Sequence, residues 1–206
     1  MIITYQGAEF FKVQQGDTVI AFNPISKDSK LKPSRFGANV VLVSAHHPDF
    51  NGAEQMSFGE KQPLVIEGPG EYETQGIFIK GFGSKTEHGG KELVNTCYLV
   101  SMDGMNLCFL GALVGELPSD LIGAAEDIDI LFVPVGGNGV LSPADAYKTA
   151  VKLESKVIIP MHYDAASLKT FLKEGGKTAE KPEEKLTVKK KDLEGKEGEI
   201  IVLAEA

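Results

Sequence analysis

The chain has no tryptophan, two cysteines and four histidines among its 206 residues. Two cysteines are too few for a fold that depends on several disulfide bonds, so the stability of the protein has to come from an ordinary hydrophobic core. No apolar run approaches the roughly 20 residues of a membrane-spanning helix, and we expect no membrane association. The segment Met1–Tyr5 lacks the basic and apolar pattern of a secretory signal. We therefore expect a cytoplasmic location.

Positive charge is also scarce. The chain has 21 lysines and arginines against 29 aspartates and glutamates, a net charge of -8 at pH 7. Nucleic-acid phosphates would repel such a molecule, so we expect no nucleic-acid partner. A small-molecule substrate or ligand is the expected partner, and both its identity and the oligomeric state stay open. The length and the hydrophobic fraction of 42% predict a single domain over residues 1–206.

The two cysteines flank a predicted hairpin turn at Asp103-Gly104. A two-residue turn there pairs positions whose numbers sum to 207, which places Cys97 opposite Leu110 and Cys108 opposite Leu99. The cysteines are then diagonal neighbours about 7–8 Å apart, a poor distance for a disulfide. We predict two reduced core residues.

Short apolar runs predict buried strands that end in polar or glycine-rich loops. The predicted strands are Met1–Tyr5, Glu9–Gln14, Thr18–Phe22, Val40–Ser44, Leu64–Ile66, Gly76–Gly81, Thr96–Met102, Met105–Gly111, Ile128–Val135 and Val157–Met161, with a last hairpin of Leu186–Lys190 and Glu199–Ala204. Capping residues predict helices over 142–154 and 164–174, and a short helix is expected over 118–125. Residues 84–91 are predicted to be a loop that holds His88.

Candidate metal ligands follow several of these strands. His47 and Asp49 come after 40–44, His162 comes after 157–161, and His88 precedes the cysteine hairpin. In layered α/β folds, sites gather at the carboxyl ends of strands, and imidazole and carboxylate donors suit a divalent metal such as Zn²⁺. The alternative is structural: a neutral His47–Asp49 pair, a His162 that bonds a backbone carbonyl, and an exposed His88. Glycine-rich residues 68–73 predict a tight corner or the wall of a site.

The chain resembles the metallo-β-lactamase superfamily, in the branch of small hydrolases similar to L-ascorbate-6-phosphate lactonase. The resemblance rests on Gly68-Pro69-Gly70-Glu71-Tyr72-Glu73, on the Asp103-Gly104 hairpin with Phe109-Leu110-Gly111, on residues 129–136 and on Ile159-Pro160-Met161-His162-Tyr163. It implies an α/β fold, a four-layer αββα metallo-β-lactamase-like sandwich, with a metal site at one edge between the sheets.

The resemblance also shows which family ligands this chain keeps. The positions that match intact metal ligands are His47, Asp49, His88 and His162. Three others are replaced: Ala45 and Phe50 stand at histidine positions of the His-x-His-x-Asp-His motif, and Ala112 stands where the family has a bridging aspartate. The Asp-Pro pair common after the third strand is here Asn23-Pro24.

Two interpretations follow. In one, the chain is a non-catalytic binding or structural module that has lost the dinuclear centre and holds no metal. In the other, one Zn²⁺ or other divalent ion is held by the four surviving ligands, and the chain is a mononuclear hydrolase of a lactone or phosphodiester substrate with Asp49 as ligand or catalytic general base. We see no support for a metal-free enzyme, because no serine or cysteine nucleophile lies in a recognisable activating setting in this sequence.

Overall fold

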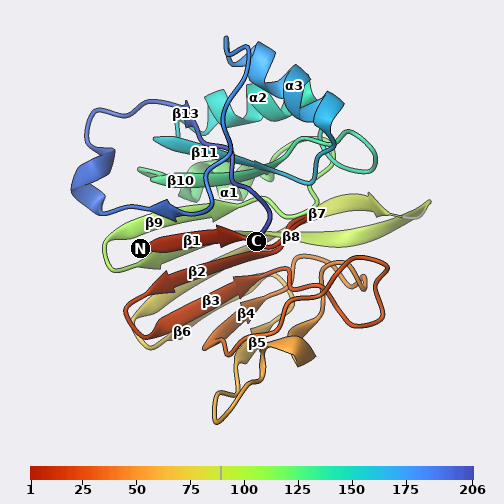
Figure 1. Cartoon of the computed structure of the whole chain (residues 1–206), viewed down its shortest axis with the longest axis vertical. Helices are drawn as coiled ribbons and strands as arrows, with labels where there is room; N and C mark the ends of the chain where they lie inside the picture. The colour runs from red at the N-terminus through yellow and green to blue at the C-terminus, as the bar shows by residue number, and fades with distance from the viewer. Residues whose placement is uncertain (89) are drawn as a thin grey trace.

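The computed structural model describes residues 1–88 and 90–206, and two β-sheets packed face to face dominate it (Figure 1). The first sheet has the order β12-β1-β2-β3-β4-β5. Its strands are β1 (Ile2–Tyr5), β2 (Phe11–Gln15), β3 (Thr18–Phe22), β4 (Val40–Leu42), β5 (Leu64–Ile66) and β12 (Leu186–Thr187). The amino-terminal meander is antiparallel, whereas β3, β4 and β5 run parallel.

The second sheet has the order β13-β11-β10-β9-β8-β7-β6. Its strands are β6 (Gly70–Thr74), β7 (Ile77–His88), β8 (Lys91–Met102), β9 (Met105–Phe109), β10 (Ile130–Pro134), β11 (Val157–Met161) and β13 (Glu199–Ile200). Strands β6 to β9 are antiparallel neighbours, and β9, β10, β11 and β13 are parallel. The long β7–β8 hairpin projects beyond its sheet (Figure 1).

The main core lies between the sheets. Aromatic rings bridge the two layers: the Phe22 and Phe109 centroids are 4.8 Å apart, and those of Phe11 and Phe132 are 4.7 Å apart. The buried Tyr98 hydroxyl donates to the Val43 carbonyl across the interface at 2.7 Å. Alternating apolar residues therefore fix which face of each sheet points inward.

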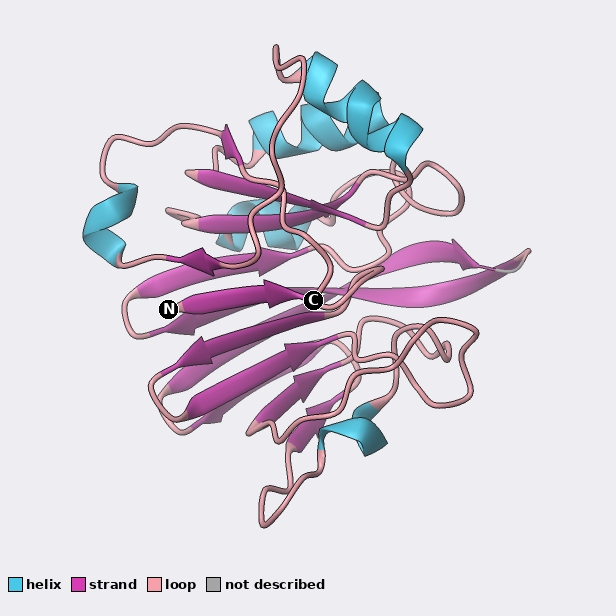
Figure 2. Ribbon diagram, viewed as in Figure 1, coloured by secondary structure: helices cyan, strands magenta, loops and turns pink. Residues whose placement is uncertain are grey.

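Helices cover the outer face of the second sheet (Figure 2). They are α1 (Ser119–Ala124), α2 (Pro143–Lys152) and α3 (Ala165–Glu174). The outer face of the first sheet is covered by residues 24–39 and by η1 (Ala53–Met56), a single 3₁₀ turn. The predicted α/β sandwich is confirmed, with that turn and its loop as the fourth layer. Among the described residues, no helix is long and apolar enough to span a membrane.

Local signals placed most elements correctly. The Ser142 hydroxyl accepts from the Asp145 amide at the start of α2, and Asp164 caps α3. The hairpin register pairs Leu99 with Cys108, as the sum of 207 predicts, and both cysteines are free and buried.

Two predictions about the chain were wrong. Residues 84–88 belong to β7, not to a loop, because β7 and β8 stay paired out to His88 and Lys91. The last two strands form no hairpin: β12 pairs with β1 in the first sheet and β13 with β11 in the second. Lys190–Leu193, between them, is the 3₁₀ turn η2. Both errors concern strand pairing: the first with the adjacent strand β8, and the second with the distant strands β1 and β11.

Candidate metal centre

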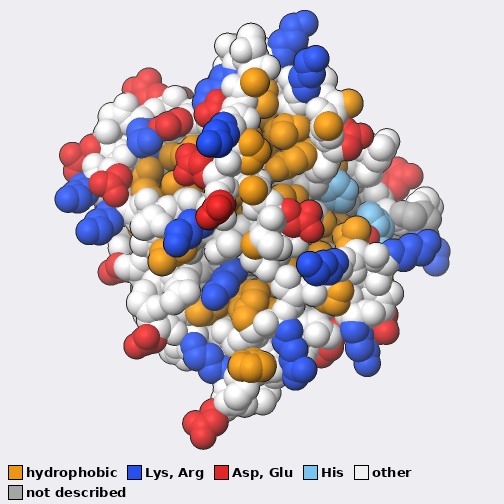
Figure 3. Space-filling view, in the orientation of Figure 1, with side chains coloured by type: hydrophobic (Ala, Val, Ile, Leu, Met, Phe, Trp, Pro, Cys, Tyr) orange, Lys and Arg blue, Asp and Glu red, His pale blue; other side chains and the backbone are white. Residues whose placement is uncertain are grey.

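Residues from distant parts of the chain meet where strands of both sheets end. Asn23 follows β3, Ser44 lies just after β4, and His162 follows β11. Glu9 precedes β2, which is antiparallel to β3, so it lies at the same edge. Figure 3 shows histidine side chains at the surface on the side where the β7–β8 hairpin projects.

Three of the predicted ligands form one compact group. The ligand atoms of His47, Asp49 and His88 all lie within 4.8 Å of one another. The Asp49 Oδ2 atom is 3.2 Å from His88 Nε2 and 3.6 Å from His47 Nδ1. The Ser29 hydroxyl donates to Asp49 Oδ1, which turns Oδ2 towards the two imidazoles. The side chains are 20–31% exposed, so the group is open to solvent.

Local structure orients His47 within this group. The Asp49 amide donates to its Nδ1 at 3.2 Å, so this nitrogen carries a lone pair. Burial, together with the neighbouring His88, lowers the pKa of His47 below its usual range, although Asp49 opposes the shift. The neutral imidazole is the form that binds metal.

His162 lies beside the group on a separate support. Its ring centroid is 6.4 Å from that of His88, and its Nδ1 is 2.7 Å from Glu9 Oε1. Burial lowers the pKa of His162, but the hydrogen bond and charge of Glu9 outweigh it and raise the pKa overall. Among the described residues, none hydrogen-bonds to Nε2 of His162. That nitrogen is therefore available to the site.

The three positions at which the resemblance implies a replaced ligand also meet. Ala45, Phe50 and Ala112 pack together with Val140 as a small, fully buried apolar cluster. The Phe50 ring lies 5.3 Å from the His88 ring and 6.2 Å from the His162 ring, centroid to centroid. Side-chain carbon thus fills this space, and the four side chains of the cluster offer no donor atom to a cation.

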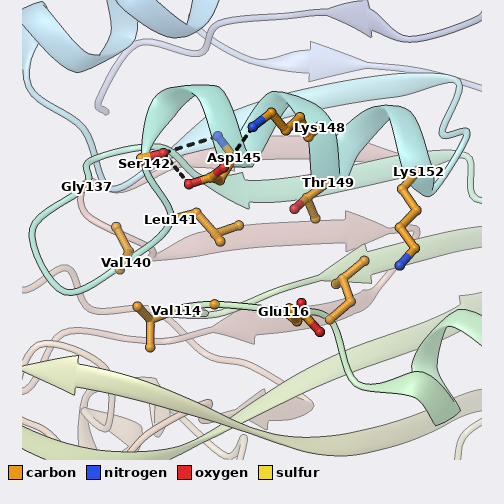
Figure 4. Close-up of a pocket in the computed structure, with 12 residues that line it drawn as sticks. Val114, Glu116, Gly137, Val140, Leu141, Ser142, Asp145, Lys148, Thr149 and Lys152 are labelled. Carbon is orange, nitrogen blue, oxygen red and sulfur yellow. Dashed lines mark hydrogen bonds and ion pairs between the residues drawn. The ribbon is translucent and has the colours of Figure 1, made fainter.

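A pocket of about 590 Å³ lies on the other side of Val140 (Figure 4). It is bounded by residues 114–117 and by the start of α2, where Ser142, Asp145 and Lys148 form a hydrogen-bonded chain (Figure 4). None of the four histidines lines it, so this pocket is distinct from the candidate metal centre.

Of the four predicted ligands, the structure groups His47, Asp49 and His88 and places His162 beside them. His46 is exposed and outside the group, and residues 70–74 form the edge strand β6 rather than a wall of the site. Glu9 was missed as a site residue. A lone acidic residue directly before Phe10-Phe11, at the start of a buried strand, was the available signal, because buried carboxylates need partners.

Comparison with known proteins agrees with this architecture. Residues 2–162 match the sequence model of a family described as a beta-lactamase superfamily domain. A UPF0173 metal-dependent hydrolase of Pelotomaculum thermopropionicum is 27% identical over 198 residues, covering 80% of this chain and 85% of the relative. Its counterpart in Carboxydothermus hydrogenoformans is 28% identical over 193 residues, with coverage of 80% and 85%.

Solved structures agree as well. A candidate Zn-dependent hydrolase of the metallo-β-lactamase superfamily from Thermotoga maritima superposes with a TM-score of 0.78 at 28% identity, covering 98% of this chain and 97% of that one. A metallo hydrolase of Ignicoccus hospitalis shares the fold with a TM-score of 0.64 at 18% identity, covering 91% and 99%. The family match covers residues 2–162, which hold most of the two-sheet sandwich, and the chain therefore belongs to the β-lactamase superfamily.

Proposed function

We propose that this protein is a metal-dependent hydrolase that works with one metal ion rather than two. The observation that carries the proposal is the His47–Asp49–His88 group, whose ligand atoms lie within 4.8 Å of one another. Two imidazoles and one carboxylate are a donor set found in catalytic zinc sites, which use three protein ligands and leave one position open. Zn²⁺ is our first choice, and another divalent ion is the second.

The surrounding residues fit a single ion. We propose Nε2 of His162 as a fourth donor: its ring centroid is 6.4 Å from that of His88, and its Nδ1 is bound to a carboxylate, the arrangement usual for metal-binding histidines. The apolar cluster of Ala45, Phe50, Ala112 and Val140 leaves no ligands for a second ion. A bound divalent ion supplies Lewis acidity and lowers the pKa of water.

The chain's own residues suggest how a substrate would be handled. The exposed fractions of the His47, Asp49 and His88 side chains leave room for a small molecule to approach. Asp49 has one oxygen held by Ser29 and the other free towards the imidazoles, so it can act as ligand or as a general base. We propose a small lactone or phosphodiester as substrate, handled in the cytoplasm by one domain spanning residues 1–206, with no nucleic-acid partner.

The competing proposal is a non-catalytic binding module. It draws on the same apolar cluster, since three family ligand positions have become side chains without donor atoms. The two proposals differ in metal content, because a binding module has no reason to keep His47, Asp49 and His88 within 4.8 Å of one another.

Metal content by elemental mass spectrometry tests the proposal. We expect about one transition metal per untagged chain purified without chelator, lost in His47→Ala and in His162→Ala. His46→Ala is the matched control, because His46 is adjacent but exposed and outside the group. A wild-type protein that stays metal-free after Zn²⁺ and Mn²⁺ are offered would refute the hydrolase. Metal-loaded protein should then hydrolyse members of a lactone and phosphodiester panel.

A further inference from the structure

The carboxylate of Glu9 is completely buried, yet it belongs to no strand and its polar partners come from two other segments. Its Oε1 atom is 2.7 Å from Nδ1 of His162, and its Oε2 accepts from Nδ2 of Asn23 at 2.7 Å. A buried carboxylate is retained only where partners satisfy it, so this position has a specific task.

The orientation of Asn23 is fixed by its other contacts. Its Oδ1 accepts from the Ser44 amide at 2.7 Å, so Nδ2 has to point towards Glu9 and the Ser44 hydroxyl. One oxygen of Glu9 is thereby committed to Asn23. The other is left to accept from His162, and a carboxylate oxygen can only accept.

The backbone at this junction is held in an unfavourable conformation. Ala8, Asn23 and His162 all have left-handed φ angles, of 51°, 45° and 52°. The His162 amide donates to the Ala8 carbonyl at 2.7 Å, which ties the segment carrying Glu9 to the segment carrying the imidazole. Non-glycine residues keep such angles only where the surrounding structure enforces them, and they gather at functional sites.

We propose that Glu9 is a positioning residue: it holds the proton of His162 on Nδ1 and so keeps the Nε2 lone pair available to the His47–Asp49–His88 group. The metal-binding part of this inference rests on the proposed function. The carboxylate of Glu9 replaces none of the lost ligands directly. It acts through His162, as carboxylates behind metal-binding histidines do.

Glu9→Gln is the informative variant. Glutamine keeps the shape but has a single oxygen, which Asn23 claims because Asn23 cannot turn. The new amide group then faces His162 and donates to Nδ1, which moves the imidazole proton to Nε2. We expect this tautomer change in long-range ¹H–¹⁵N spectra of the metal-free protein, at a pH where the imidazole is neutral. We also expect Zn²⁺ affinity to fall about 10–100-fold.

Glu54→Gln is the matched control, since Glu54 accepts from Ser26 and contacts no histidine. It should leave the spectrum of His162 and the Zn²⁺ affinity unchanged. If the neutral imidazole of His162 carries its proton on Nε2 in the wild-type protein, the inference is overturned. This measurement needs no variant. Unchanged tautomer and affinity in Glu9→Gln would overturn it too. Wild-type protein that binds no metal refutes the proposed function instead, while the tautomer comparison still decides the role of Glu9.

Discussion

At the scale of single residues, Phe50 is the largest side chain of the apolar cluster beside the candidate metal centre. Its ring is fully buried among Ala45, Ala112 and Val140, against the imidazoles of the site. We expect Phe50→Ala to lower the free energy of unfolding by about 3–5 kcal/mol, because it removes a large core side chain and leaves a cavity. Urea denaturation measures the loss.

The control for this prediction is Phe58→Ala. The Phe58 side chain is 62% exposed, so its removal should change stability by no more than about 0.5 kcal/mol. Equal losses in the two variants would mean that the apolar cluster is not a packed part of the core.

The thiols make a second prediction at this scale. Burial raises the pKa of Cys97 to about 12 from an ordinary 9.0, and burial raises that of Cys108 as well. Because the thiolate is the nucleophile, we expect no labelling by iodoacetamide in the native protein at pH 8, and two labels per chain in urea. Mass spectrometry counts the labels. Rapid labelling of the native chain would contradict the buried placement.

The raised pKa of Cys97 also makes the free energy of unfolding depend on pH. The unfolded chain releases its thiol protons above about pH 8.5, whereas the folded chain keeps them. The contribution of Cys97 is therefore fully present below that pH and is lost as the pH rises through its folded pKa of about 12. Cys97→Ala should flatten this alkaline fall in the free energy of unfolding.

At the scale of elements, the end of β7 brings His88 to the site. We call this end of β7, residues 84–88, the β7 arm. It is held in place by Gly139, whose carbonyl accepts a hydrogen bond from the Thr86 hydroxyl at 3.2 Å. A Cβ atom on Gly139 would lie 1.9 Å from the Glu87 carbonyl oxygen. We expect Gly139→Ala to push the β7 arm away and to separate His88 from Asp49. Metal affinity should then fall at least tenfold, and competition with a chromogenic chelator measures the fall.

The comparison variant is Gly104→Ala. Gly104 has a similar φ, +72° against +80°, but an added Cβ atom would meet nothing within 4 Å. It should cost the backbone strain of about 1 kcal/mol alone and leave metal affinity unchanged. A matching loss of affinity in both variants would show that strain, not the contact with Glu87, is responsible.

A second prediction at the scale of elements concerns Asp129, which lies directly before β10 and pairs with Lys190 of η2. The carboxylate of Asp129 is fully buried and accepts from Lys156 at 2.9 Å and from Lys190 at 2.7 Å. It also accepts from the Asn106 amide, so it ties η2 to β9 and β10. We expect Asp129→Ala to cost about 1–3 kcal/mol of unfolding free energy, because the Asn106 amide and the two partly exposed lysines lose a buried acceptor.

Asp127 provides the control, since it pairs with the same two lysines at the surface. Hydrogen bonds from Lys156 and Lys190 lower the pKa of Asp127, but its side chain is 59% exposed and water screens the pair. Asp127→Ala should cost less than about 1 kcal/mol. Thermal unfolding compares the two variants, and a larger effect for Asp127 would contradict the assignment.

At the scale of the whole molecule, the candidate metal centre links the two sheets. His47 and Asp49 follow a strand of the first sheet, and His88 and His162 end strands of the second. An ion that binds only the folded chain stabilises it by about 2.7 kcal/mol at a hundred times the dissociation constant. We expect Zn²⁺ to raise the melting temperature and EDTA to reverse the rise. His47→Ala should abolish both effects, and a shift that survives in this variant would place the ion elsewhere.

Much of this structure is readable from local sequence. Ser142 and Asp164 begin helices because their side chains accept amides of the first turn, and the Asp103-Gly104 turn sets a register that aligns Leu99 with Cys108. The strand of residues 157–161 follows from its unbroken apolar run. Such signals act over a few residues, so no knowledge of distant partners is needed.

What the local pattern missed depends on strand pairing and on contacts between segments, most of them far apart along the chain. The polar residues of 84–88 look like a loop, and only pairing with β8 makes them a strand. The two short strands near the C-terminus go to different sheets because β1 and β11 offer free edges there. Glu9 is 153 positions from His162, and no local spacing indicates that contact.

The sequence by itself determined most of the strands and the starts of two helices, and its resemblance to a family indicated the αββα class and the candidate ligands. Only the tertiary structure decided that His47, Asp49 and His88 form one group, that Glu9 supports His162, and that Ala45, Phe50 and Ala112 close together as an apolar cluster. The physical reason is range. Hydrophobic period and capping are short-range and written in neighbouring residues, whereas a site is made where strand ends distant in sequence are brought together by the packing of two sheets.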